Sequence, residues 1–237
     1  MRVTPVRCIA KIFSVFAAAF SLAVISCAAN DDSASLTIQM PGSSSSRAIS
    51  SEGHLEASDA PDLNFSVYIR DSDNEEVEKY TNVAPGTKLT ISALRAGNYK
   101  VAIRGITGGS VMFYGAADAL VQGGVENTVG IKLEDANNDG RINFYTSSSI
   151  DNNNKVRTEI KCKNGDSYST SMETVLDEVG GAGVSYYYPL NDCFFEPGFT
   201  YTATIYIYGV DGEMGDLYGT YTTSAKATKD GIVFTVN

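Results

Sequence analysis

The chain has 237 residues, with 28 acidic side chains against 18 lysines and arginines, and a formal net charge of −10. This acidity excludes nucleic acid and anionic lipid headgroups as electrostatic partners, because both would repel the chain. Tryptophan is absent, whereas 14 tyrosines occur together with Thr, Val and Ile in short runs separated by Gly, Asn and Asp. This composition is typical of β-strands punctuated by turns.

The first 27 residues have the layout of an export signal. An apolar stretch over residues 12–25 follows the three cations Arg2, Arg7 and Lys11. Its end, Leu-Ala-Val-Ile-Ser-Cys at residues 22–27, resembles the lipobox of bacterial lipoproteins. The resemblance implies that residues 1–26 are removed as a signal peptide and that the Cys27 thiol carries a lipid such as palmitate. It also implies a bacterial cell-envelope location, anchored to a membrane rather than spanning it.

Two other interpretations of this stretch stay open, a signal cleaved elsewhere and an uncleaved membrane anchor. The apolar run is shorter than the ~18 residues that a spanning helix needs, and no Ala-x-Ala-like site precedes Cys27. Loss of residues 1–26 removes three cations and no anion, which leaves 15 basic and 28 acidic side chains and a net charge near −13. We therefore expect membrane contact through the lipid, with the folded part in the periplasm or on the cell surface.

Residues 27–60 are small and polar, with a serine run at residues 43–46. Such a composition cannot bury enough apolar surface to offset ordering of the backbone, so it predicts a flexible tether. One possible strand interrupts the tether at residues 34–40, where apolar and polar side chains alternate. The only histidine, His54, lies in this region, and we interpret it as a solvated residue rather than a metal ligand or catalytic base.

Regular alternation begins at residue 63, where Leu63, Phe65, Val67 and Ile69 face one way and polar side chains face the other. This pattern predicts a strand with one buried face. An acid cluster at residues 75–78 predicts a solvated edge strand, because charge hinders pairing at the edge of a sheet. Glycine turns separate further predicted strands, at residues 88–93, 100–105, 111–114, 119–121 and 128–133.

The same pattern of predicted strands separated by glycine turns starts again after a boundary at residues 135–143. The recurring residues are Gly97, Tyr99 and Tyr114-Gly115 in the first stretch and Gly198, Tyr201 and Tyr218-Gly219 in the second. We predict two related modules, at residues 35–134 and 140–237, although any two β-rich stretches could share such punctuation. Residues 172–179 are predicted to form a helical turn or two. The predicted fold is all-β, with two tandem β-sandwich modules after a signal peptide and tether.

The stretch Leu94-x-Ala96-Gly97-x-Tyr99-x-Val101 resembles the corner that enters a late strand in immunoglobulin-like and transthyretin-like modules. In that corner an aromatic residue packs its ring inside and bonds its hydroxyl to the backbone. The resemblance implies these roles for Tyr99 and an immunoglobulin-like sandwich for the modules. It concerns the fold alone, and a fold does not determine a function.

Two cysteines follow Cys27 in the sequence, Cys162 and Cys193. A disulfide can persist in an exported domain. A Cys162–Cys193 bridge would close a loop of about thirty residues and stabilise the fold by roughly 3–4 kcal/mol. The alternative is two buried free thiols that behave as small hydrophobic residues. We predict the bridge, and we predict no redox or zinc role because the sequence has no Cys-x-x-Cys pair.

Residues 135–143 read Asp-Ala-Asn-Asn-Asp-Gly-Arg-Ile-Asn and resemble the first part of an EF-hand calcium loop. The resemblance implies side-chain ligands from Asp135, Asn137 and Asp139 and a carbonyl ligand from Arg141. The twelfth position is Thr146, where that family has a bidentate glutamate, so any calcium would bind weakly. We predict a turn between modules and no cofactor, since Asn, Asp and Gly favour turns. Calcium remains the open alternative.

The sequence contains no G-x-S-x-G, H-E-x-x-H or P-loop motif, and it has no carboxylate pair in an apolar setting. We therefore predict that the protein is not an enzyme. Tyr206 and Tyr208 alternate with isoleucines, so both tyrosines are exposed if the isoleucines face the core. They could bind protein or glycan, or simply form the outer surface of a sheet.

Together these observations predict a lipid-anchored cell-envelope protein with a non-catalytic binding, adhesive or structural role. Its partners would be the membrane, through the N-terminal lipid, and a protein or glycan ligand. Nucleic acid is excluded. The alternative is a glycan-binding surface lipoprotein that uses the tyrosines Tyr206 and Tyr208.

Overall fold

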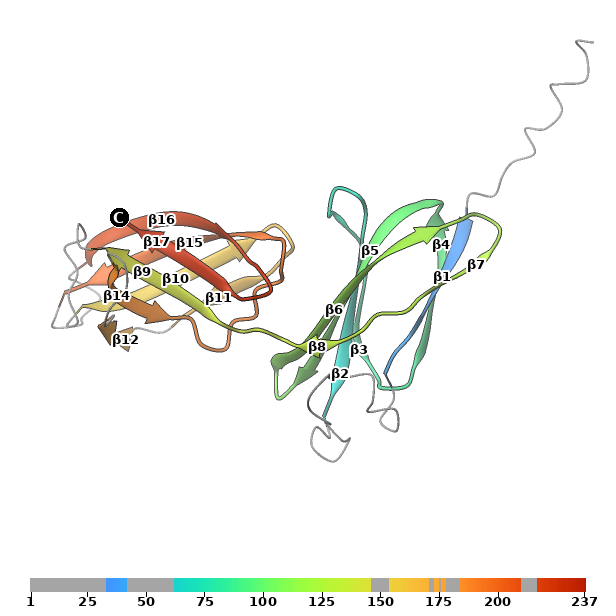
Figure 1. The fold of residues 1–237 in the computed structure, drawn as a ribbon, viewed down its shortest axis with the longest axis horizontal. Helices are drawn as coiled ribbons and strands as arrows, with labels where there is room; N and C mark the ends of the chain where they lie inside the picture. Colours follow the sequence, from blue (N-terminus) through green and yellow to red (C-terminus); the bar gives the residue numbers. More distant parts are fainter. Residues whose placement is uncertain are drawn as a thin grey trace, which may run out of the picture.

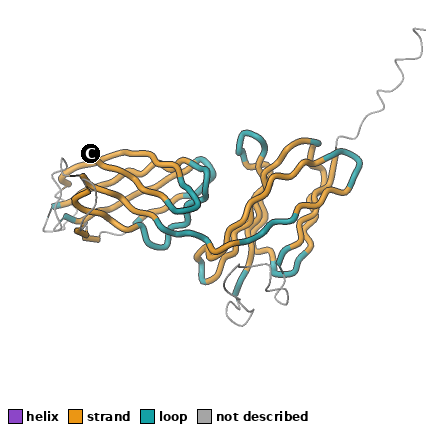
Figure 2. The backbone as a smooth tube through the Cα atoms, in the orientation of Figure 1, coloured by secondary structure: helices purple, strands orange, loops and turns teal. Residues whose placement is uncertain are grey.

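The structure is a computed structural model that describes residues 33–41, 62–145, 154–170, 173–174, 176–177, 184–209 and 217–237. Within these ranges every regular element is a β-strand, which confirms the predicted all-β class (Figure 1, Figure 2). The described residues include no helix that is long and apolar enough to cross a membrane. Cys27 and His54 lie outside the described ranges.

The first sandwich consists of two sheets formed by the strands up to residue 135. Its strands are β1 (Ser33–Gln39), β2 (Asn64–Arg70), β3 (Glu76–Val83), β4 (Lys88–Arg95), β5 (Gly97–Thr107), β6 (Ser110–Val121), β7 (Glu126–Val129) and β8 (Glu134–Asp135). One sheet has the order β4-β1-β7 and the other β3-β2-β5-β6-β8. The possible strand at residues 34–40 is therefore β1, the central strand of its sheet. The acid-rich β3 lies at an edge, as predicted.

The second sandwich consists of two further sheets. Its strands are β9 (Gly140–Tyr145), β10 (Lys155–Cys162), β11 (Ser167–Ser169), β12 (Glu173–Thr174), β13 (Leu176–Asp177), β14 (Val184–Pro189), β15 (Thr200–Tyr208), β16 (Leu217–Lys226) and β17 (Ile232–Val236). One sheet has the order β13-β14-β9-β17, and the other has the order β11-β10-β15-β16 with β12 on β10. The helical turn predicted around β12 and β13 is wrong, because these residues hydrogen-bond to β10 and β14 instead.

The two sandwiches share one pairing scheme. In each, the first strand pairs in parallel with a strand near the end of the module, β1 with β7, which precedes the two-residue β8, and β9 with β17. In each, a long central strand lies between two antiparallel neighbours, β5 between β2 and β6 and β15 between β10 and β16. The strands that the sequence repeat matched, β5 with β15 and β6 with β16, thus occupy equivalent positions.

Each sandwich encloses its own apolar core. In the first, alternate residues of β2 point inward, and Phe65, Val67 and Ile69 are fully buried. In the second, Ile205 and Ile207 of β15 point inward. Burial of each such side chain contributes about 1.5–3 kcal/mol relative to exposure, which makes the alternating strands the main source of stability.

The corner predicted from resemblance is present in the first sandwich. Gly97 opens β5, and the Tyr99 ring packs against the first core while remaining partly exposed. The Tyr99 hydroxyl donates a hydrogen bond to the Arg95 carbonyl at 3.0 Å. Tyr99 thereby ties the end of β4 to the start of β5, which confirms the role that the resemblance implied.

A short linker joins the sandwiches, which lie next to each other along the longest axis of the molecule (Figure 1). Before it, β8 pairs with β6 of the first sandwich, and after it β9 pairs with β17 of the second. Within it, the Ala136 amide donates to the Met112 carbonyl at 2.8 Å, and the Asn137 side chain donates to the Lys229 carbonyl at 3.1 Å. The linker is therefore bonded to both sandwiches.

Candidate functional site at the module junction and adjoining cleft

The outer face of β2 and β5 is buried, contrary to the prediction of a single buried face. Ser66, Tyr68 and Arg70 of β2 are 4, 7 and 1% exposed, and Arg104 of β5 is 5% exposed. The second sandwich covers this face, since its Glu196 binds Arg70 of β2 and its Asp166 binds Arg104 of β5. Alternation within one strand indicates which side chains share a face, but not whether another module covers that face.

Two arginines of the first sandwich meet two carboxylates of the second at this junction. Arg70 binds Glu196 with both of its terminal nitrogens, Nη1 to Oε1 at 2.6 Å and Nη2 to Oε2 at 2.9 Å. Arg104 binds Asp166 in the same two-pronged manner at 2.7 and 3.0 Å, and its Nη2 also reaches Glu196 Oε2 at 2.6 Å. The four side chains, which we call the junction network, carry no net charge when all are ionised.

The junction network is shielded from solvent. The Arg70 and Glu196 side chains are 1 and 0% exposed, and those of Arg104 and Asp166 are 6 and 10% exposed. Buried charges are tolerated when they are paired and their remaining hydrogen-bonding capacity is used. Glu196 meets this condition, because the Tyr114 hydroxyl also donates to its Oε1 at 3.1 Å.

Aromatic rings frame the two guanidinium groups. The Arg70 guanidinium carbon lies 4.8 Å from the centre of the Phe199 ring, and that of Arg104 lies 4.6 Å from the Tyr68 ring and 5.2 Å from the Phe194 ring. A cation over an aromatic face is attracted by the ring electrons, and the attraction strengthens without water. The planar guanidinium groups are therefore held by rings as well as by carboxylates.

Tyr201 positions both carboxylates from within the second sandwich. Its ring belongs to the second core, and its hydroxyl donates to Asp166 Oδ2 at 2.7 Å while accepting a hydrogen bond from the Glu196 amide at 2.7 Å. The turn that joins Glu196 to Tyr201 depends on Gly198, which has a φ of +92°. Tyr201 is the counterpart of Tyr99 in the sequence repeat, so the equivalent tyrosine here supports the junction.

The surroundings of Arg104, Tyr114 and Tyr201 raise the pKa of each of these three groups. Burial alone would lower the pKa of Arg104, but the hydrogen bond and charge of Asp166, aided by Glu196, outweigh it and raise that pKa. Burial raises the pKa of Tyr114 and of Tyr201, and the adjacent carboxylate charges raise both further. Across the neutral range the tyrosines are uncharged donors and the guanidinium is a cation. Arg104, Tyr114 and Tyr201 therefore serve this junction as hydrogen-bond donors.

An exposed ion pair lies at the rim of the same junction. Lys163 of the second sandwich lies 3.4 Å from a carboxylate oxygen of Glu75 in the first, and the two side chains are 60 and 68% exposed. Exposed pairs contribute about 0–1 kcal/mol because water and salt screen them. The rim pair therefore adds little to the junction, and the buried network dominates.

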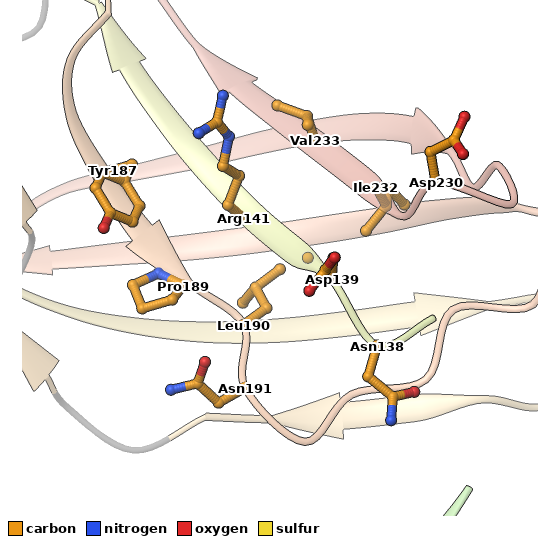
Figure 3. Close-up of a pocket in the computed structure, with 11 residues that line it drawn as sticks. Asn138, Asp139, Arg141, Tyr187, Pro189, Leu190, Asn191, Asp230, Ile232 and Val233 are labelled. Atoms are coloured by element: carbon orange, nitrogen blue, oxygen red, sulfur yellow. The ribbon is translucent and has the colours of Figure 1, made fainter. Parts of the chain in front are cut away.

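A cleft opens in the second sandwich next to the linker, and Figure 3 shows its lining. Its volume is about 460 Å³. The lining residues come from the linker, β9, the end of β14 and the start of β17: Asn138, Asp139, Gly140, Arg141, Tyr187, Pro189, Leu190, Asn191, Asp230, Ile232 and Val233. Carboxylates, carboxamides, an aromatic ring and aliphatic side chains thus share one opening.

The residues of the predicted calcium loop are divided between the two sandwiches. Asp135 belongs to β8, which pairs with Phe113 of β6, whereas the Asp139 carbonyl accepts a hydrogen bond from the Ile232 amide of β17. The Asn137 side-chain oxygen accepts a hydrogen bond from the Asp139 amide at 2.8 Å, which forms a tight turn. Among the described residues no group of three or more His, Cys, Asp or Glu could hold a metal. Residues 137–139 thus form a turn between β8 and β9. Arg141, the expected carbonyl ligand, lies in β9.

The predicted disulfide is not formed, because Cys162 and Cys193 are both free. Cys193 is buried in the second core, and Cys162 packs against the same core while partly exposed. Burial raises the pKa of both thiols, that of Cys193 to about 11, which disfavours the reactive thiolate. These cysteines instead serve as small apolar side chains, the alternative that the sequence left open.

The expected exposure of both tyrosines on β15 is also wrong. Tyr208 is only 5% exposed, although Ile205 and Ile207 face the core as expected. Tyr206 is half-buried, with the Arg157 guanidinium 5.8 Å from the centre of its ring. The alternation of buried and exposed side chains along β15 ends at Tyr208, which is buried although it was expected to face solvent.

The sequence reasoning missed the junction network, although one signal for it exists. Glu196 stands in an aromatic run, Cys-Phe-Phe-Glu-Pro-Gly-Phe at residues 193–199. A carboxylate among large apolar residues requires a buried partner. No comparable signal marks Arg70 or Arg104, which occupy polar positions of ordinary amphipathic strands.

No family model matches the chain, and no curated protein matches it in sequence. Among solved structures, the Bacillus anthracis TIE protein matches with 16% identity and a TM-score of 0.28, over 86% of this chain. This chain spans about a third of that protein, 33% of its length. A proposed adhesin from Bacteroides ovatus matches with 11% identity and a TM-score of 0.31, over 80% of this chain and 75% of that one. The fimbrial anchor protein Mfa2 from Porphyromonas gingivalis matches with 11% identity and a TM-score of 0.30, over 79% and 81%. Similarity at this level does not determine a function.

Proposed function

We propose that this protein is a non-catalytic component of the bacterial cell envelope, anchored by lipid at Cys27, which holds a binding or adhesive surface at a fixed geometry. The observation that carries this proposal is the junction network. It joins the two sandwiches through charges that are almost fully buried. A presenting or structural protein gains from such a junction, because the distance and orientation of its outer surface stay constant.

The chemistry of the junction also supports a non-catalytic role. Catalytic acids and bases need a titrating group within reach of a substrate. Glu196 instead has both carboxylate oxygens occupied by arginines, and it is 0% exposed. The strongest charge cluster of the described residues is therefore committed to internal contacts.

The anchor in this proposal rests on the lipobox resemblance at residues 22–27. The chain after Cys27 is strongly acidic, so anionic headgroups would repel the folded part. A tether at residues 27–60 would let the sandwiches stand away from the membrane. In this proposal the folded part consists of two modules, at residues 35–134 and 140–237.

The anchor is tested by expressing the full chain and its Cys27→Ser variant in a bacterial host with an alkyne-labelled palmitate. We expect label and membrane fractionation for the parent chain, and neither for the variant. Cys8→Ser is the matched control and should leave both unchanged. An unlabelled parent chain, or a labelled Cys27→Ser variant, would refute the lipid anchor.

Rigid presentation is tested separately by small-angle X-ray scattering on the purified protein and its Glu196→Gln variant. We expect the parent curve to match a single fixed arrangement of two sandwiches. The variant should give a larger radius of gyration, since an unpaired buried arginine favours opening of the junction. A parent protein that requires an ensemble of open arrangements would contradict the proposal.

A further inference from the structure

We propose that the cleft of the second sandwich binds a neutral saccharide. The proposal goes beyond the function proposed above, because it assigns a ligand class and a place that the junction and the anchor do not determine. The cleft volume of about 460 Å³ lies in the range of about 300–1,000 Å³ that is usual for small-ligand pockets. That volume accommodates a monosaccharide or one end of an oligosaccharide.

The backbone holds the cleft in shape. The Leu190 amide donates to the Gly140 carbonyl at 2.8 Å, and the Ile232 amide donates to the Asp139 carbonyl at 2.9 Å. Strand register sets Pro189 and Val233 on either side of Arg141, one on each neighbouring strand. The three side chains form a cross-strand row, and neighbours in such a row have Cβ atoms about 4.5–5.5 Å apart.

The cleft offers hydrogen-bonding groups that the fold leaves unused. Within the described residues, the carboxylates of Asp139 and Asp230 form no hydrogen bond or ion pair, and both residues are exposed. An ionised carboxylate accepts through two oxygens, and a carboxamide such as that of Asn191 both donates and accepts. Vicinal sugar hydroxyls, each a donor and an acceptor, match these groups.

The cleft also offers apolar surface for the C–H face of a sugar ring. Tyr187 and Pro189 stand on one side of the opening in Figure 3, opposite Asp139 and Asp230. Val233 adds aliphatic surface at 46% exposure. A tyrosine suits this position, because its ring packs against C–H groups while its hydroxyl stays hydrogen-bonded. Polar and apolar groups are mixed around the opening, with Asn191 beside Pro189 and Val233 beside Asp230 (Figure 3), and this mixture fits a ligand that has both kinds of surface.

Charge selects neutral sugars over acidic ones. Asp139 and Asp230 outnumber the single cation Arg141 among the lining residues, in a chain of net charge −10. A uronic or sialic acid would therefore be repelled. A bound metal is a poorer fit, because the described residues hold no group of three or more His, Cys, Asp or Glu.

The test is a binding screen of the purified protein against immobilised neutral and acidic oligosaccharides, followed by calorimetry on the neutral ones that bind. Two cleft variants, Tyr187→Ala and Asp230→Asn, should each weaken binding by about tenfold or more, the loss expected for a removed charged hydrogen bond or aromatic contact. Two matched controls outside the cleft, Tyr206→Ala and Asp192→Asn, should bind as the parent protein does. EDTA should have no effect.

Thermal unfolding of each variant separates loss of the ligand from loss of the fold. Asp230→Asn preserves size and lies in an exposed turn, so it provides the decisive variant if Tyr187→Ala lowers stability. The proposal is overturned if no neutral oligosaccharide binds or if only acidic ones do. It is equally overturned if the controls lose binding as the cleft variants do, or if EDTA abolishes binding.

Discussion

Replacement of Glu196 by glutamine is the sharpest test of the junction. The substitution keeps the shape of the side chain and removes one buried negative charge. Arg70 then loses both of its bonds to a carboxylate, at 2.6 and 2.9 Å. Arg104 loses one partner but keeps Asp166 at 2.7 and 3.0 Å. One excess positive charge therefore remains in a region where the Arg70 side chain is 1% exposed.

The expected loss follows from that excess charge. Removal of one member of a buried ion pair typically destabilises a protein by about 3–5 kcal/mol, because the remaining charge is desolvated without compensation. The amide nitrogen of glutamine would add to the loss, since it directs donors at guanidinium donors. Each kcal/mol lowers the Tm of a chain of this length by about 2–4 °C, so we expect a decrease of roughly 6–20 °C.

Equilibrium urea unfolding measures the loss through the shift of the midpoint. Glu75→Gln is the matched control, because it breaks an ion pair across the same junction whose members are 60 and 68% exposed. That control should cost about 1 kcal/mol or less. A second variant, Glu196→Gln combined with Arg70→Met, removes the excess charge and should recover most of the stability. If Glu196→Gln costs no more than Glu75→Gln, the reasoning from burial is refuted.

Two further predictions concern packing and pH. A methyl group on Gly140 would meet a ring carbon of Phe195 at 2.5 Å, so Gly140→Ala should destabilise the protein by about 1–3 kcal/mol in urea unfolding. The control is Gly130→Ala, whose methyl group meets nothing within 4 Å and should leave the stability unchanged. The pKa values of Tyr114 and Tyr201 are raised above 10.0 in the folded state, so the folded protein holds these protons to higher pH than the unfolded chain. Their contribution to stability is fully present below about pH 10 and is lost as the pH rises above it. Tyr114→Phe should reduce this alkaline loss in unfolding measured at pH 8 and pH 10.5, and an unchanged loss would contradict the assignment.

The strands were predictable wherever local pattern and tertiary packing agree. Phe65, Val67 and Ile69 alternate with polar residues, and the structure buries all three. The repeat of Gly97 and Tyr99 as Gly198 and Tyr201 matched strands that occupy equivalent places in the two sandwiches. These features depend on side-chain period and turn chemistry, which a single sequence contains.

The junction network was not predictable from such patterns. Arg70 and Arg104 occupy polar positions on strands that look half-solvated, and only the second sandwich makes those positions buried. The free state of Cys162 and the burial of Tyr208 also depend on packing between segments distant in sequence. Periodicity assigns a side chain to a face, whereas its exposure depends on what covers that face.

The separation of the network partners in sequence has a consequence for the order of folding. Glu196 follows Arg70 by 126 residues, although the strands of the first sandwich are complete at residue 135. Because domains generally fold as units, the first sandwich can close before the second sandwich presents Glu196 to Arg70. Proteolysis of a truncated chain that ends before residue 166 tests this order, and full protection of the Arg70 face would contradict it. Until the second sandwich docks, the face of the first sandwich that holds Tyr68, Arg70 and Arg104 is uncovered. The step most open to misassembly is therefore docking of two finished modules rather than the closure of either one.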